Sequence, residues 1–218
     1  MRTETELLSR SFWDKTWSRF LRHQGMIAPS AKLIQHMVQL VPRHGLVLDL
    51  GCGEGRNTIY LARIGFRSIG LDLSKKAVKV VANNLFEEEV KGTCLVGDAR
   101  QLPFGNAVLD GILAHHLFDH LDREGLYTAF AECYRVLKPG APLLMTCDTF
   151  ASVRGDRHLT TREDGTMLFT GGPQKGLQIR LLVDTDYRHL TDHGWEELKN
   201  DTTPGGSRIA MFRRRPAI

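Results

Sequence analysis

The sequence lacks any long apolar run. No hydrophobic stretch approaches the roughly 20 residues that a helix needs to cross a bilayer. The first residues, MRTETE, are polar and acidic, so they lack the apolar core of a signal peptide. From these two absences we expect a soluble, cytoplasmic protein that has no membrane partner.

Cysteine is also scarce. The chain has 4 cysteines among its 218 residues, and no two of them form a Cys-x-x-Cys pair. Their spacings match no zinc-binding framework, and three of them lie in apolar runs, where a free thiol behaves as a small hydrophobic group. We therefore expect reduced, structural cysteines and no metal cofactor.

Excess charge of one sign is limited as well. The formal net charge is +4, and part of it comes from the run Arg213–Arg215. Because no basic stripe interleaved with aromatic residues is present, nucleic acid is not expected as a partner. The sequence shows no internal repeat or low-complexity segment, and 42% of its residues are hydrophobic. This composition predicts one globular domain over residues 1–218.

What the sequence does contain is an alternation of short apolar strands and amphipathic helices. Leu46–Leu50 is nearly continuously apolar, as expected for a parallel strand covered on both faces. A helix is expected to follow and to be closed by Gly65, and Ser74 is a suitable cap for the next helix. Further strands are predicted at Ser68–Leu71, Cys94–Val96, Val108–Ala114 and Pro142–Thr146, and helices at Arg56–Ile64 and Arg123–Leu137. The alternation predicts an α/β, Rossmann-like, doubly wound sheet with helices on both faces.

Two regions depart from this rhythm. Residues 1–44 are predicted to be helical, with a helix that Pro42 stops. Within them Trp13 and Trp17 stand four residues apart, hence on one helical face. They either staple this segment to the core or form a flap over a pocket. Residues 151–184 are rich in glycine, arginine and aspartate and are predicted to be an insertion, with a substrate lid as one role.

The second half of the chain is predicted to contain antiparallel pairs. Within the insertion we expect a hairpin of strands Thr166–Phe169 and Leu177–Val183. A short helix over Asp186–His193 follows. The last two strands, Trp195–Lys199 and Arg208–Phe212, are joined by a short connection and should therefore be antiparallel.

Glycines and acidic residues follow the predicted strands at positions suited to a nucleotide-like cofactor. Gly51, Gly53 and Gly55 would let the backbone turn tightly, and the helix that follows would aim its free N–H groups at a ligand. Asp72 ends the second strand, 21 residues after Gly51, where an acidic residue can accept hydrogen bonds from both ribose hydroxyls. Asp98 ends the third strand and could accept from the adenine amine. Alternatively, Asp72 caps a helix and Asp98 is an ordinary turn residue.

Taken together, these motifs resemble those of the class I S-adenosylmethionine-dependent methyltransferase superfamily, small-molecule type. The matching segments are VLDLGCGEG at 47–55, GLD at 70–72, GDA at 97–99, LDGIL at 109–113 and YRVLKPG at 134–140. The resemblance covers about residues 45–150. It implies seven strands in the order 3-2-1-4-5-7-6 with strand 7 antiparallel. It also implies that S-adenosylmethionine is the cofactor and that the chain is an enzyme that transfers its methyl group.

The resemblance assigns roles to single residues around the methionine and ribose portions of the cofactor. The glycine turn, with Gly51, Cys52 and Gly53, would lie beside the methionine portion. Asp49 would orient this loop or bind the cofactor amine through water. Asp72 would bind the ribose.

The resemblance extends to the adenine, the sulfonium and the N-terminal segment. Leu73 would pack on the adenine, whose edge Asp98 and Ala99 would hold, while Ala114 and His115 would lie nearest the sulfonium. The tryptophans Trp13 and Trp17 resemble the Trp-Asp-x-x-Trp/Tyr opening of small-molecule members, including the tellurite-resistance type, and are predicted to contribute to the cofactor site.

Methyl transfer from a sulfonium is an in-line displacement, to which positioning of the reactants contributes much. A general base is needed only if the acceptor arrives protonated. If there is one, His115 and His116 are the candidates, because they follow the fourth predicted strand; otherwise no catalytic residue is required. The helical spacing of His116, Asp119 and His120 leaves a metal site as the alternative to the predicted absence of metal.

A small molecule is the expected acceptor, because no appended binding domain is visible and the positive charge is mild. RNA or protein as acceptor is the first alternative. A non-catalytic cofactor-binding protein is the second. The third is an NAD(P)-dependent oxidoreductase, against which the turn reads Gly-x-Gly-x-Gly rather than Gly-x-Gly-x-x-Gly.

Overall fold

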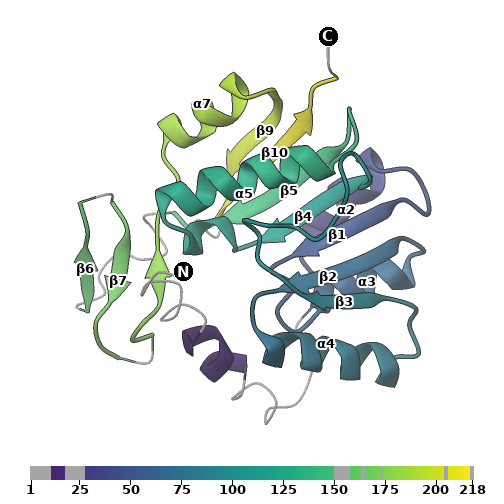
Figure 1. Cartoon of the computed structure of the whole chain (residues 1–218), viewed down its shortest axis with the longest axis horizontal. Helices are drawn as coiled ribbons and strands as arrows, with labels where there is room; N and C mark the ends of the chain where they lie inside the picture. Colours follow the sequence, from purple (N-terminus) through teal and green to yellow (C-terminus); the bar gives the residue numbers. More distant parts are fainter. Residues whose placement is uncertain are drawn as a thin grey trace.

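The computed structural model describes residues 11–17, 28–149, 158–163, 165–172, 174–203 and 206–216. Figure 1 shows a central sheet with helices on both sides and a smaller sheet beside it. None of the helices in the described ranges is long and apolar enough to cross a membrane. The predicted α/β architecture is confirmed, whereas the assignment of residues 1–218 to a single domain stays a prediction.

The large sheet has seven strands in the order β3-β2-β1-β4-β5-β10-β9. Neighbouring strands from β3 to β5 are parallel, and β10 is antiparallel to both β5 and β9. Counted along the chain within this sheet, the order is the predicted 3-2-1-4-5-7-6 with strand 7 antiparallel. The strands are β1 (Leu46–Leu50), β2 (Arg67–Asp72), β3 (Thr93–Val96), β4 (Gly111–His115), β5 (Pro142–Cys147), β9 (Trp195–Thr202) and β10 (Arg208–Arg214).

Helices cover both faces of this sheet (Figure 1). On one face, Met37 and Leu61 pack in a cluster with Val47 of β1. Its neighbour Leu48 points the opposite way and packs in the largest cluster with Phe130. The central strands are therefore apolar on both sides, which explains their continuous apolar runs. The helices are α2 (Ala31–Leu40), α3 (Arg56–Arg63), α4 (Lys75–Glu87), the 3₁₀ helix η1 (Phe118–His120), α5 (Arg123–Val136) and α7 (Asp184–Asp192).

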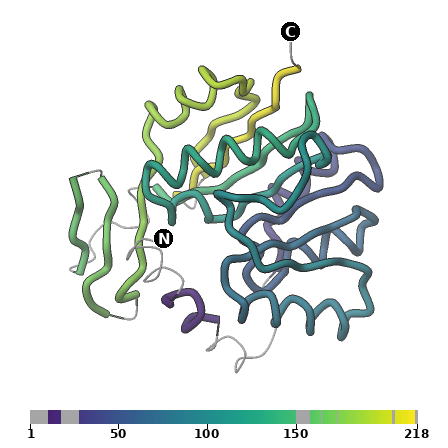
Figure 2. The backbone as a smooth tube through the Cα atoms, in the orientation of Figure 1, coloured from purple at the N-terminus to yellow at the C-terminus, as the bar shows by residue number. Residues whose placement is uncertain are grey.

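The smaller sheet lies within the predicted insertion. Its antiparallel strands are β6 (Leu159–Thr161), β7 (Met167–Phe169) and β8 (Gln178–Ile179). It has an apolar cluster of its own, against which Phe12 and Trp13 pack. Figure 2 shows the helical segment 11–17, in purple, next to this sheet, in green. Two segments far apart in the sequence therefore meet beside the large sheet.

Two predicted strands are shorter by two or more residues in the structure. The strand predicted at Val108–Ala114 begins only at Gly111, because the Asp110 carboxylate binds the Leu46 N–H and the Lys138 ammonium and turns the chain before the strand. The strand predicted at Leu177–Val183 is reduced to β8, because the Arg180 N–H bonds to the carbonyl of Asp119 in η1 instead of to a neighbouring strand.

Two further features of this region differ from the prediction. The helix predicted at Asp186–His193 is α7, which begins two residues earlier, and the Asp186 carboxylate bonds to the Val183 N–H at its start. Strand β6 was not predicted, since three residues carry too little periodicity to be recognised. The predicted features at 1–10, 18–27 and 150–157 lie outside the described residues.

Candidate functional site

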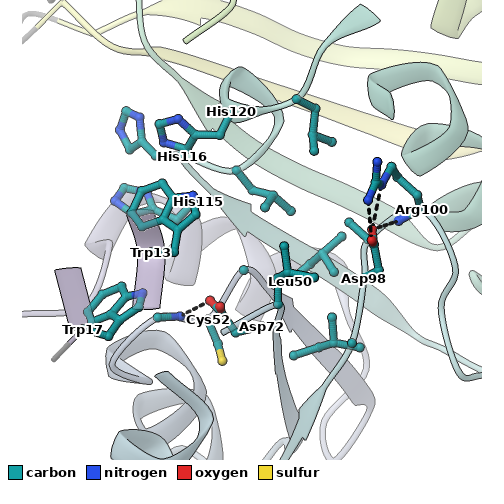
Figure 3. Close-up of a pocket in the computed structure, with 18 of the residues that line it drawn as sticks. Trp13, Trp17, Leu50, Cys52, Asp72, Asp98, Arg100, His115, His116 and His120 are labelled. Carbon is teal, nitrogen blue, oxygen red and sulfur yellow. Dashed lines mark hydrogen bonds and ion pairs between the residues drawn. The ribbon is translucent and has the colours of Figure 1, made fainter. Parts of the chain in front are cut away.

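A cavity of about 310 Å³ lies at the carboxyl ends of β1, β2 and β4. The strand order reverses between β1 and β4, which is where open α/β sheets bind their ligands. Figure 3 shows three groups of lining side chains: the histidines His115, His116 and His120, then Asp72 near Trp17, and Asp98 paired with Arg100. The cavity is therefore formed by residues that follow neighbouring strands at one edge of the sheet, together with residues from other segments.

The glycine turn after β1 forms the floor of the cavity. Gly53 has a left-handed φ of +55°, and a Cβ at this position would lie 2.7 Å from two ring carbons of Trp17. Gly55 has a φ of +86° and caps α3, where a Cβ would meet Val81 at 2.8 Å. Only glycine satisfies both the backbone conformation and the close approach at these positions.

Asp72 ends β2 and faces this turn. Its Oδ2 accepts from the Gly53 N–H at 3.0 Å, and its Oδ1 accepts from the Ser74 N–H at 2.8 Å. Burial raises the pKa of Asp72, and the nearby charge of Asp14 adds to the increase, although the two backbone donors oppose it. Each carboxylate oxygen keeps acceptor capacity beyond its one backbone bond. The group is therefore fixed in place and can still accept from a ligand.

The two other predicted aspartates have protein partners of different kinds. Asp49 is buried, accepts from both the N–H and the hydroxyl of Thr58, and does not line the cavity; burial raises its pKa to about 6. It therefore anchors the start of α3. Asp98 lines the cavity, but its carboxylate binds the Arg100 guanidinium at 2.9 and 2.6 Å and also the Arg100 N–H.

His115 ends β4 and lines the cavity. Its Nδ1 lies 2.7 Å from the Thr146 hydroxyl. Burial, reinforced by the charges of His116 and Arg56, lowers the pKa of His115 to about 3. The imidazole is therefore neutral at physiological pH, so it adds no positive charge to this end of the cavity.

His116 follows directly and has a different environment. It has a φ of +50°, which is rare for a residue with a side chain. Its Nδ1 lies 3.3 Å from Oδ2 of the fully buried Asp119 and 3.7 Å from Oδ1 of Asp148. His116 directly follows β4, Asp119 lies in η1 and Asp148 directly follows β5, and the polar atoms of the three side chains lie within 4.8 Å of one another.

The N-terminal helical segment 11–17 lines the cavity with Trp13 and Trp17. Trp17 lies against Gly53, and Asp14 bonds to the Ser74 hydroxyl. Trp13 packs edge-on against His120, with ring centroids 4.9 Å apart. His120 in turn donates from Nδ1 to the carbonyl of Gln178 in β8 at 2.9 Å. The segment 11–17 and the small sheet therefore both border the cavity.

Most of the residues singled out in the sequence meet around this one cavity. Ala114 is fully buried and, like Asp49, does not line it. Those that do line it are Trp13, Trp17, Gly51, Cys52, Gly53, Asp72, Leu73, Asp98, Ala99, His115 and His116. All four cysteines are free, as predicted. The predicted roles of these residues toward a ligand stay proposals.

Other lining residues were missed in the sequence. Arg56 and Asn57 stand directly after the glycine turn, a position that could have indicated them. Their side chains bind the Ala28 carbonyl and the Ser30 N–H. Gln178 had no local signal, because only the folding of the insertion brings it to the cavity.

Comparisons with known proteins agree with this geometry. Residues 47–140 match the family model described as methyltransferase domain. An O-methyltransferase of Penicillium expansum is 36% identical over 113 residues, which cover 50% of this chain and 40% of that one. An 18S rRNA (guanine-N(7))-methyltransferase of Arabidopsis thaliana is 31% identical over 159 residues, covering 65% and 54%. The matched segment spans about two fifths of the length of the first curated relatives.

The fold has close counterparts among solved structures. A protein of Pyrococcus horikoshii superposes with a TM-score of 0.73 at 20% identity, covering 84% of this chain and 88% of that one. The strand order, the glycine turn facing an acidic residue and the match over residues 47–140 agree with one another. Residues 47–140 therefore match a methyltransferase domain, and the fold is the one seen in solved S-adenosylmethionine-dependent methyltransferases such as that of Methanosarcina mazei.

Proposed function

We propose that this chain transfers a methyl group from S-adenosylmethionine to a small-molecule acceptor. The observation that supports it best is the arrangement of Asp72 beside the glycine turn. The backbone N–H groups of Gly53 and Ser74 hold both carboxylate oxygens, so the group is oriented before any ligand arrives. A fixed carboxylate with two oxygens suits the vicinal hydroxyls of a ribose.

The other lining residues are assigned from their places around Asp72. Gly51, Cys52 and Gly53 would border the methionine portion, as they form the turn at the end of β1. Leu73 and Ala99 are apolar lining residues that suit the faces of a purine. Asp98 lines the cavity close to Ala99 and carries a carboxylate, the kind of acceptor that suits an adenine amine.

The reacting end of the cavity would lie at His115. When bound, S-adenosylmethionine supplies an electrophilic methyl group on a cationic sulfonium. The neutral imidazole of His115 places no opposing charge near that cation. Trp13 and Trp17 cover the cavity, which would restrict water and hold the reactants in line.

The same cover favours a small acceptor. An acceptor would reach the carboxyl end of β4 past Trp13, His120 and Gln178, which line the cavity from the segment 11–17, η1 and β8. A small molecule fits such an enclosed approach better than a folded RNA or protein surface. The relatives' names, an O-methyltransferase and an rRNA methyltransferase, point to different acceptors, so RNA remains the alternative to test.

The remaining alternatives make different predictions. A non-catalytic protein would bind S-adenosylmethionine without forming a methylated product. An NAD(P)-dependent oxidoreductase is disfavoured by the family match over residues 47–140. It is disfavoured also by the charge of Asp14 close to Asp72, which would repel the ribose phosphate of NADP.

The test uses S-adenosylmethionine carrying a labelled methyl group. The protein is incubated with it and a cell extract, and metabolites, RNA and protein are then separated. We expect the label in the metabolite fraction. Label in RNA or protein would contradict the small-molecule acceptor, and unlabelled fractions together with tight cofactor binding would indicate a protein without turnover.

A further inference from the structure

His116 has a backbone conformation that few residues with a side chain adopt. A left-handed φ of +50° costs free energy in a residue with a side chain, and such strain persists where the surroundings impose it. The His116 N–H bonds to the carbonyl of Thr146 at 3.0 Å and to its hydroxyl at 3.2 Å. The backbone at the end of β5 therefore fixes the orientation of His116 toward the cavity that it lines.

Asp119 fixes the imidazole of His116. The Asp119 side chain is fully buried, and its Oδ2 accepts from the Asp148 N–H at 2.8 Å. The same Oδ2 lies 3.3 Å from Nδ1 of His116. A carboxylate so anchored selects the tautomer in which Nδ1 carries the proton, which leaves Nε2 with its lone pair free. The arrangement is that of an aspartate that orients a histidine acting through its other nitrogen.

Neighbouring His115 has no such partner. Its ring lies edge-on to that of His116, with centroids 4.6 Å apart, and its Nδ1 meets a neutral hydroxyl instead of a carboxylate. Burial lowers the pKa of His115 to about 3, so this imidazole is a poor proton acceptor. Of the two histidines at the end of β4, only His116 combines access to the cavity with a carboxylate partner.

We propose that His116, positioned by Asp119, is the general base of this site and that the acceptor atom is the oxygen of a hydroxyl group. The inference rests on the proposed function. A hydroxyl becomes strongly acidic only as its oxygen bonds to carbon, so its proton must be removed during the displacement. A thiol is partly ionised near neutral pH, and a neutral amine attacks through its lone pair, so neither needs a base at the moment of attack.

The step balances without any further reactant. The hydroxyl oxygen forms a bond to the methyl carbon while the carbon–sulfur bond breaks, and the bonding pair stays on sulfur as a neutral thioether. The hydroxyl proton passes to Nε2 of His116. The resulting imidazolium is stabilised by the Asp119 carboxylate, with Asp148 nearby, and later releases its proton to water.

The charged and titratable groups that face His116 set its pH dependence. They are Asp119 from η1, Asp148 after β5, Arg56 from α3 and the adjacent His115. Burial lowers the pKa of His116, but the hydrogen bond and charge of Asp119 and the charge of Asp148 outweigh it, so the net pKa is raised. Because the base must be neutral, the rate should rise with pH through an ionisation above the ordinary value of about 6.5.

The test compares three variants with the wild type, using labelled S-adenosylmethionine and the same metabolite fraction as the source of acceptor. His116→Gln keeps a hydrogen-bonding side chain but cannot take a proton. Asp119→Asn keeps an acceptor for the Asp148 N–H but removes the charge. His36→Gln, on α2 and outside the cavity lining, is the control. Isothermal titration with S-adenosylmethionine checks that each variant still binds the cofactor, and a thermal melt checks that it is folded.

We expect [methyl-¹³C]S-adenosylmethionine to give a product whose ¹³C shift is that of an O-methyl group. His116→Gln should lower kcat by about 100-fold or more with an unchanged cofactor Kd, and its remaining activity should not vary with pH across the wild-type inflection. Asp119→Asn should lower kcat and move that inflection to lower pH, since burial then dominates. His36→Gln should match the wild type.

Other outcomes would overturn the proposal and are distinguishable. Transfer by the wild type to nitrogen, sulfur or carbon refutes the hydroxyl acceptor while leaving the methyltransferase activity intact. Full activity of His116→Gln refutes the base. Loss of wild-type activity on treatment with EDTA, restored by a divalent cation, would assign the cluster of His116, Asp119 and Asp148 to a metal instead. No transfer by the wild type to any fraction would refute the proposed function, and with it this inference.

Discussion

Replacing Asp72 with alanine removes a carboxylate that is both fixed by the glycine turn and open to a ligand. The wild-type side chain accepts from the N–H groups of Gly53 and Ser74 and, in the proposed complex, from the ribose hydroxyls. Removing hydrogen bonds to a charged group typically costs about 1.5–3 kcal/mol. The Kd for S-adenosylmethionine should therefore rise roughly 10- to 150-fold.

Isothermal titration measures this Kd, and the control is Asp110→Ala. Asp110 also accepts a backbone N–H, that of Leu46, at 2.8 Å, but it lies before β4, at the opposite end of that strand from the cavity. Both variants should lose some thermal stability, since each leaves a backbone donor without its partner. Only Asp72→Ala should bind the cofactor more weakly. Equal cofactor affinity in Asp72→Ala and the wild type would refute the assigned cofactor orientation.

Three other changes test separate parts of the structure. Trp17→Ala uncovers Gly53 and should weaken S-adenosylmethionine binding by up to roughly 10-fold in isothermal titration, whereas unchanged binding would show that the segment 11–17 is no part of the site. Burial raises the pKa of Asp49 to about 6, so its ionisation weakens the fold as pH rises from roughly 4 through 6. Over this range the unfolding free energy of the wild type, measured in urea, should fall by about 3 kcal/mol relative to that of Asp49→Asn. If the two unfolding free energies changed in parallel with pH, this assignment would be wrong. Arg180 and Asp186 form a buried ion pair with a 2.7 Å contact, so Arg180→Met should lower the unfolding free energy in urea by about 3–5 kcal/mol. Adding Asp186→Asn should restore a large part of that stability, because it removes the uncompensated charge. A double variant no more stable than Arg180→Met would refute the uncompensated charge as the cause.

The fold could be predicted from the sequence because its signals are local. The apolar strand Leu46–Leu50, the glycine turn and Asp72 stand within one strand–helix–strand unit, and the hydrogen bond from Gly53 to Asp72 joins positions only 19 residues apart. Strand order followed from the resemblance, and the structure has the same order. The predicted bounds were wrong at Val108–Ala114, where the Asp110 side chain binds the distant Leu46 N–H. They were also wrong at Leu177–Val183, where the Arg180 N–H bonds to the distant Asp119 carbonyl.

The site was predicted only in part, because several of its contacts join distant segments. The histidines after β4 were identified as candidates, but nothing in the sequence showed that Asp148 would join Asp119 beside His116. The helical spacing considered for His116, Asp119 and His120 is also not what the structure has, since η1 spans only Phe118–His120. The pairing of Asp98 with Arg100 was local and could have been recognised, since the two stand two residues apart.

The proposed methyl transfer converts S-adenosylmethionine to S-adenosylhomocysteine, and mass spectrometry measures this conversion. The wild type and Asp72→Ala are each incubated with S-adenosylmethionine, with and without the metabolite fraction of a cell extract. We expect acceptor-dependent formation of S-adenosylhomocysteine by the wild type, and much less by Asp72→Ala at a cofactor concentration near the wild-type Kd. A wild type that binds S-adenosylmethionine but forms no S-adenosylhomocysteine with any fraction would contradict the proposed methyl transfer.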